Sequence, residues 1–301
     1  MPAPEGTVPA PSGADPDQTN SINGNSSFFD PSTAIKLPDV TGSIPRKPAA
    51  APKPSAPAAQ SAIDALPASI GTVLRNAVAA SDPAAEYELG ARYAEGRGVP
   101  QNPTEAALWL QRAADAGFAP AQFRLASINE KGDGVRKDLQ TARRLYLAAA
   151  GKGHAKSMHN LAVLYAEGID GKPDYKAASE WFRKAAAYGV TDSQYNLAIL
   201  FARGIGVQVN LAESYRWFAL AAANGDSDAA RKRDEVAARL DAKTLAMAKA
   251  AVQSFVAERE PDEAVNLKAP PGGWDHVPAA PAKPRRQVSG GSSQAPASIV
   301  R

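Results

Sequence analysis

Large apolar residues return at fixed positions along the middle of the chain, one copy every 36 residues. One column holds a leucine in every copy, at Leu89, Leu125, Leu161 and Leu197. A second column holds a large apolar side chain, at Trp109, Leu145, Trp181 and Trp217. A third holds glycine, at Gly117, Gly153, Gly189 and Gly225. Because no insertion disturbs this register, the pattern predicts four repeats, at residues 83–118, 119–154, 155–190 and 191–226.

Each repeat has the polar and apolar spacing of two helices. In the first repeat, Leu89 and Tyr93 are four residues apart and therefore share one face of a helix predicted for residues 83–95. The tripeptide "SDP" at its start supplies a capping aspartate and a proline suited to the first helical position. Trp109 lies in an apolar stripe with 3/4 spacing, which predicts a second helix over residues 104–116.

Glycines separate the two helices of each repeat. One set directly follows the first helix, at Gly96, Gly132, Gly168 and Gly204. A second set lies two residues further on, at Gly98, Gly134 and Gly206. A phosphate-binding loop needs a strand before its glycines, whereas here a helix precedes them, so we interpret both sets as turn residues. In the third repeat Asp170 and Gly171 break the pattern, which favours a shifted turn over a calcium loop.

Helical hairpins of this kind bury their apolar faces only by stacking on their neighbours. The sequence therefore predicts an all-α fold, an α/α superhelical solenoid with the tryptophan column in its core. Residues 66–82 and 227–258 are expected to form capping helices, the latter with Arg233 in place of the column leucine. The ends, residues 1–65 and 259–301, are rich in proline, alanine and serine and are expected to be disordered.

Composition excludes several classes of function. The formal net charge is only +3 and no long basic run is present, which argues against a nucleic-acid partner. No apolar run is long enough to span a bilayer. The chain contains no cysteine, and its three histidines, His154, His159 and His276, are not spaced to converge on a metal. No catalytic motif is visible, so we expect no cofactor and no enzymatic activity.

The repeat unit, with its leucine, glycine and tryptophan columns, resembles the Sel1-like repeat family, a tetratricopeptide-like α/α solenoid. The stretch "MHNLAVLYAEGIDGKPDYKAASEWF", together with the later "PPGGWD", is also similar to the C-terminal region of alphaproteobacterial PodJ-like polar localisation factors. That second resemblance implies the periplasmic end of a larger protein with a role in polar localisation. A periplasmic or cell-envelope location follows if it holds, and a cytoplasmic location otherwise.

The first helices of such solenoids line the concave side, so their exposed positions are candidate binding residues. Two residues before each leucine lies a ring, at Tyr87, Phe123, His159 and Tyr195. Beside this ladder lie amide and charged side chains, at Glu88, Arg124, Asn160 and Asn196. Further charges lie near the helix ends, at Glu95, Lys131, Glu167 and Arg203. A ring beside a hydrogen-bonding group suits an interface, but the rings can equally fill space between neighbouring first helices.

The leading functional hypothesis is a non-enzymatic scaffold that binds a protein or peptide in this groove. An alternative is a module that binds peptidoglycan, because sugars stack on aromatic rings. A weaker alternative is a hydrolase, because paired carboxylates are the requirement for glycan cleavage and acidic residues are plentiful on the first helices.

Overall fold

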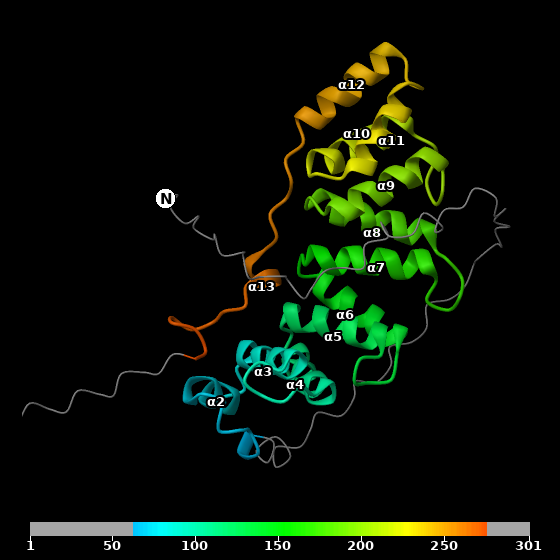
Figure 1. The fold of residues 1–301 in the computed structure, drawn as a ribbon. Coiled ribbons are helices and arrows are strands. Elements are labelled where there is room, and N and C mark those ends of the chain that lie inside the picture. Colours follow the sequence, from blue (N-terminus) through cyan, green and yellow to red (C-terminus); the bar gives the residue numbers. More distant parts are fainter. Residues whose placement is uncertain (1–62, 276–301) are drawn as a thin grey trace, which may run out of the picture.

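The structure, a computed structural model, describes residues 63–275 and shows a stack of helical hairpins (Figure 1). The helices are α2 (Thr72–Ala79), α3 (Pro83–Glu95), α4 (Pro103–Asp115), α5 (Ala119–Lys131), α6 (Leu139–Ala150), α7 (Ala155–Glu167), α8 (Tyr175–Ala187), α9 (Thr191–Arg203), α10 (Leu211–Ala223), α11 (Ser227–Ala237), α12 (Ala242–Gln253) and α13 (Asp262–Val265). No strand occurs within residues 63–275. The predicted all-α solenoid is confirmed, while most of the expected disordered ends lies outside the described residues.

Each hairpin closes in the same way. The second helix begins at a side-chain cap whose oxygen accepts a backbone N–H three residues on, at Asn102, Asp138, Asp174 and Asn210. The backbone N–H of the same capping residue donates to a carbonyl near the end of the first helix, for example from Asn102 to Tyr93 at 2.8 Å. The bond recurs even in the third repeat, from Asp174 to Tyr165 at 2.8 Å, so its altered loop keeps the hairpin geometry.

The altered loop is a shifted turn. The N–H of Gly171 donates to the carbonyl of Gly168 at 3.0 Å, and both glycines have positive φ. Asp170 accepts a hydrogen bond at 2.9 Å from Gln140 of the preceding repeat. The aspartate therefore joins two repeats.

The columns point into the core, with one exception. All four column leucines are buried, as are Trp109, Leu145 and Trp217, but Trp181 is only partly buried. The Nζ of Lys184 lies 3.8 Å from its ring centroid. The position one residue later is buried more completely in every repeat, at Leu110, Tyr146, Phe182 and Phe218. This column fills the centre of each hairpin and was not singled out in the sequence.

Adjacent repeats approach closely at the second set of glycines. A Cβ added to Gly134 would lie 2.5 Å from the carbonyl carbon of Pro103, at the start of α4. A Cβ on Gly206 would lie 2.3 Å from the backbone of Tyr175, at the start of α8. These loops therefore touch the preceding repeat, in addition to requiring positive φ.

The structure differs from the sequence prediction at the start of the stack and agrees with it at the end. The lead-in helix α2 starts only at Thr72, because Pro67 disfavours a helical Leu66 and Gly71 is extended with ψ 157°. At the other end, Asp241 caps α12 as predicted, since its Oδ1 accepts the N–H of Thr244 at 2.9 Å. None of the helices in the described part of the chain is both long and apolar enough to cross a membrane.

Residues 256–275 form a strap that runs back from α12 along the stack toward α2 (Figure 1). We call these residues the C-terminal strap. Their composition predicts a disordered tail beginning at residue 259, but in the structure they include the short helix α13, which packs against α5. Ala264 of α13 is fully buried and Trp274 is 9% exposed. Burial of these two side chains supplies apolar contact that the composition of the segment does not suggest.

Candidate peptide-binding track

The strap follows the junctions at which one repeat turns into the next. The backbone N–H of Glu258 donates to the carbonyl of Ala187, at the end of α8, at 2.9 Å. One junction further along, the carboxylate of Glu260 accepts the N–H of Ala155, the first residue of α7, at 2.6 Å. We call the surface beneath the strap the junction track; its members are Tyr87, Pro120, Phe123, Gly153, His154, Ala155, Lys156, Ala187 and Gly189.

The start of α7 gives the track a site for a carboxylate. The first N–H groups of a helix have no partner within the helix, and the helix dipole favours a negative charge there. His154 caps α7 by accepting the N–H of Ser157 at its Nδ1, 3.1 Å away, which leaves the N–H of Ala155 for Glu260. Lys156 lies nearby along the same track. The local charge at this junction therefore favours an acidic ligand.

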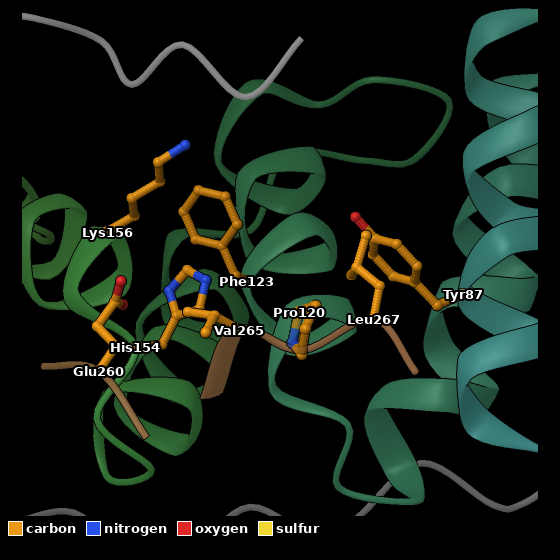
Figure 2. Close-up of a pocket in the computed structure, with 8 residues that line it drawn as sticks. All are labelled: Tyr87, Pro120, Phe123, His154, Lys156, Glu260, Val265 and Leu267. Carbon is orange, nitrogen blue, oxygen red and sulfur yellow. The ribbon is translucent and has the colours of Figure 1, made fainter. Parts of the chain in front are cut away.

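A cavity of about 190 Å³ lies between the first helices and the strap (Figure 2). The repeats contribute Tyr87, Pro120, Phe123, His154 and Lys156, and the strap contributes Glu260, Val265 and Leu267. The rings of Phe123 and His154 have their centroids 4.7 Å apart. The cavity thus combines an aromatic and apolar wall with a lysine and a carboxylate at its margin.

His154 is held neutral in this wall. Burial lowers the pKa of its imidazole to about 4, and the nearby Lys156 lowers it further in the same direction. Protonation at Nδ1 would remove the acceptor for the N–H of Ser157. The cap of α7 therefore depends on the neutral imidazole.

The far end of the strap is held at α3. Trp274 joins the apolar cluster formed by α2, α3 and their neighbours. The next residue, Asp275, forms an ion pair with Arg92 at 2.9 Å, and this partner lowers the pKa of the Asp275 carboxyl. Arg92 is itself buried and also pairs with Glu88 at 2.8 Å. Two side chains in succession, one aromatic and one acidic, therefore anchor this end.

The four predicted ladder rings mainly fill the core. Tyr87, Phe123 and His159 are 7%, 4% and 0% exposed, and Tyr195 is half-buried. Three of them contact the ring of the deeply buried column in their own repeat: Phe123 with Tyr146, His159 with Phe182, and Tyr195 with Phe218. The space-filling interpretation therefore describes most of the ladder. Tyr87 and Phe123 in addition line the cavity.

The neighbouring amide and charged positions are also largely engaged. Arg124 donates to Glu95 of the preceding repeat at 2.7 Å. Asn160 is buried and donates to the hydroxyl of Tyr146 at 2.9 Å, and that hydroxyl donates to Glu130 at 2.6 Å. Burial raises the pKa of Glu130, which favours its protonated form. The contact of Arg124 joins two neighbouring first helices, and the contacts of Tyr146 join a second helix to the first helices on either side.

The remaining candidates divide by exposure. Asn196 is 2% exposed, at the position equivalent to Asn160. Lys131, Glu167 and Arg203 are exposed at the C-terminal ends of α5, α7 and α9, the helix ends opposite those that the strap crosses. On α5 and α7 the strap contacts the N-terminal half of the helix, whereas on α3 it reaches Arg92, near the C-terminal end. A signal for it existed in Trp274, a large aromatic residue within a proline- and glycine-rich segment.

The described residues include no cluster of three or more histidine, aspartate or glutamate side chains with the geometry to hold a metal ion. The track is built from backbone groups, rings and single charges. Such a surface is suited to binding a polypeptide segment.

The fold and the track define an α/α repeat solenoid with a surface for an extended chain. The family model described as Sel1 repeat matches residues 83–118, 119–154, 155–189 and 191–226. The chain belongs to the Sel1 repeat family, whose proteins generally act as protein-interaction scaffolds. The family matches place the repeats within one residue of the predicted boundaries.

Two solved structures illustrate the relationship. The chain is 30% identical to a Sel1 repeat protein from Oxalobacter formigenes, over 59% of this chain and 75% of that one, with a TM-score of 0.51. It is 28% identical to a protective antigen present in uropathogenic Escherichia coli strains that displays an SLR fold, over 64% of this chain and 41% of that one, with a TM-score of 0.52. The search of curated proteins gave no significant match.

Proposed function

We propose that the chain is a protein-interaction scaffold that binds an extended segment of another protein along the junction track. The observation that carries this proposal is that the track holds an extended polypeptide, the strap, in the structure. Main-chain groups bind that segment at Ala187 and Ala155, and side chains enclose it near Phe123. A few anchors of this kind on a rigid surface are the usual basis of peptide recognition.

The repeat architecture explains why such a track exists. Stacking places the start of each first helix beside the start of the next, so unpaired N–H groups and turn carbonyls recur at regular intervals along one edge. An extended chain laid across that edge meets one junction after another. Because the junctions differ in sequence, as with His154 and Val190 at equivalent caps, the edge can select among segments.

No observation on the described residues specifically supports binding of peptidoglycan. It depended on a ladder of ring faces for sugars to stack on, and three of those four rings are buried between helices. The hydrolase alternative depended on carboxylates along the first helices. Two of these, Glu86 and Glu88, are paired with Arg112 and Arg92 at 2.8 Å each.

We propose further that the protein works in the cell envelope, as part of a polar localisation factor. The support is the resemblance of residues 158–182 and of "PPGGWD" to PodJ-like proteins. That hexapeptide includes Trp274 and Asp275, the two residues that anchor the strap. Imaging of a tagged protein in its native cells, with fractionation of periplasm and cytoplasm, tests this. A diffuse cytoplasmic signal would contradict it and leave the scaffold proposal standing.

Site-specific photocrosslinking tests the scaffold proposal. A benzophenone side chain at Lys156, which lines the track, is expected to capture one defined protein in native cells. The matched control is Leu108, which is 56% exposed on α4 and lies outside the track. Capture at position 156 and not at 108 is the expected result. Equal capture at both positions, or none at 156 even in a chain whose strap is displaced, would show that the track is not the binding surface.

A further inference from the structure

We infer that the junction track is a binding surface for a specific kind of partner segment, whose chemistry the strap itself displays. That segment is extended and acidic, with a carboxylate directly followed by a proline, a small apolar residue three positions later, and a terminal tryptophan–aspartate pair. The strap occupies the track in the absence of such a partner and competes with it. This inference rests on the proposed function and specifies the ligand of the same surface.

The first support is the match between the strap and the junction at α7. Glu260 accepts the N–H of Ala155, and the next residue, Pro261, packs on Gly153. A Cβ on Gly153 would lie 2.6 Å from the Cδ of Pro261, so only a glycine leaves room for the proline ring. The equivalent Gly225, beyond the strap, has nothing within 4 Å of its added Cβ. The glycine that closes every repeat, with positive φ in all four copies, therefore also leaves room for the proline ring at this junction.

The second support is the burial pattern within the strap. Ala264 is fully buried against α5, while Val265 and Leu267 line the cavity and remain 40% and 45% exposed. A larger residue at position 264 would meet α5, because the alanine has no exposed surface left. Ala269, five residues further on, is exposed. The surface thus requires a small residue at one position and tolerates variety nearby.

The third support is charge. The strap brings Glu260 to the N-terminus of α7 and Asp275 to the buried Arg92. Lys156, the residue after Ala155, lies at the cavity margin on the same side as Glu260 (Figure 2). The N-terminus of α7, Lys156 and Arg92 all attract acidic groups. A segment with basic residues in place of Glu260 and Asp275 would therefore be repelled at both ends.

The strap is also built to be released. Its helix α13 has only four residues, which is too short to be stable in water without the track. Val256, where the strap leaves the stack, is 84% exposed, whereas Phe255 before it packs on Trp217 with ring centroids 5.9 Å apart. Detachment therefore pivots at Val256 and leaves α12 in place.

A tethered occupant raises the concentration that a partner needs. A segment joined to its site by a short tether has an effective concentration there on the order of 1 mM. The apparent affinity of a partner segment equals its intrinsic affinity multiplied by the fraction of chains whose track is open. A partner segment of equal intrinsic affinity would therefore bind the full chain at least about tenfold more weakly than a chain whose strap is displaced.

The test uses the full chain and a synthetic peptide of residues 256–275 as the probe. The variant Ala264→Asp places a charge against α5 and is expected to detach the strap while leaving the track unchanged. The matched control is Ala269→Asp, which makes the same change at an exposed strap position. Fluorescence anisotropy of the labelled peptide measures binding to each chain, and circular dichroism confirms that each remains folded.

The peptide is expected to bind the Ala264→Asp chain at least about tenfold more tightly than the unaltered chain or the Ala269→Asp chain. A peptide that itself carries Ala264→Asp is expected not to bind, a result that no loss of protein folding can produce. Equal binding to all three chains, or binding of both peptides alike, would overturn the inference.

Failure of this test and failure of the proposed function give different results. If the peptide does not bind the Ala264→Asp chain but crosslinking at position 156 still captures a partner, the partner chemistry inferred from the strap is wrong and the scaffold function stands. If crosslinking at position 156 captures nothing even in the Ala264→Asp chain, the scaffold function itself is contradicted.

Discussion

The contact between neighbouring repeats can be measured with one pair of glycines. Gly98 and Gly134 occupy the same position in the first and second repeats, with φ of +72° and +70°. An added Cβ at Gly98 meets nothing within 4 Å, whereas at Gly134 it meets the backbone of Pro103 at 2.5 Å and that of Thr104 at 2.7 Å. Alanine at either position incurs the same conformational cost, but only at Gly134 does it collide with another repeat.

The conformational cost of a left-handed alanine is roughly 1–2 kcal/mol. At Gly134 the collision adds the cost of overpacking, typically about 1–3 kcal/mol, because backbone atoms cannot rotate out of the way. We therefore expect Gly98→Ala to lower the free energy of unfolding by about 1–2 kcal/mol and Gly134→Ala by about 2–5 kcal/mol.

Urea unfolding of the full chain, followed by helical circular dichroism, gives both values. The difference between the two variants isolates the contact between repeats, since the loop conformation is shared. If the two variants lose the same stability, the close approach at Gly134 contributes nothing and the inferred stacking of loop on helix is wrong.

Three further changes test the core and the cap of α7. Trp109→Ala should lower the free energy of unfolding by about 3–5 kcal/mol, because the Trp109 side chain is buried. Trp181→Ala should lower it by clearly less, because the Trp181 side chain is partly exposed. Equal losses of stability in urea unfolding would contradict this. Tyr146→Phe should cost about 1–3 kcal/mol, since Glu130 and Asn160 lose their shared partner. The pKa of His154 is lowered to about 4, so the free energy of unfolding should fall by about 3 kcal/mol as the pH drops from 6.5 to 4. The variant His154→Asn retains a capping oxygen but no titrating ring, and it should lose that part of the fall. An undiminished fall in the variant would count against a titrating His154.

The repeat could be predicted from the sequence because four copies keep one register. Leu89 and its three equivalents, the helix over residues 83–95 and the cap at Asp241 are all local patterns with a physical cause. Each is set by residues within one turn or one hairpin. Stacking then follows from the exposed apolar faces of those hairpins.

The strap could not be predicted in the same way, because its structure depends on surfaces distant in sequence. Glu260 reaches Ala155, 105 residues away, and Arg92 reaches Asp275, 183 residues away. Alone, the segment is rich in proline, glycine and charge, which is typical of a linker. Only the track supplies the apolar contact that orders Ala264 and Trp274.

For a related reason, the sequence alone does not show whether the ladder rings face an open groove. Periodicity identifies which residues share the face of a helix, but it does not say whether a neighbouring helix covers that face. Tyr195 contacts Phe218 of α10, and His159 contacts Phe182 of α8, so both rings lie within their own hairpins.

Hydrogen exchange at the amide of Ala155 tests the central claim, that the junction track binds an extended segment, most directly. This N–H opens α7, where no intrahelical partner exists, and it donates to Glu260 of the strap. Thr191, which opens α9 behind Val190 without a side-chain cap, serves as the reference. We predict that Ala155 exchanges at least about tenfold more slowly than Thr191 and that Glu260→Ala abolishes the difference. Equal exchange of the two amides in the unaltered chain would contradict the account.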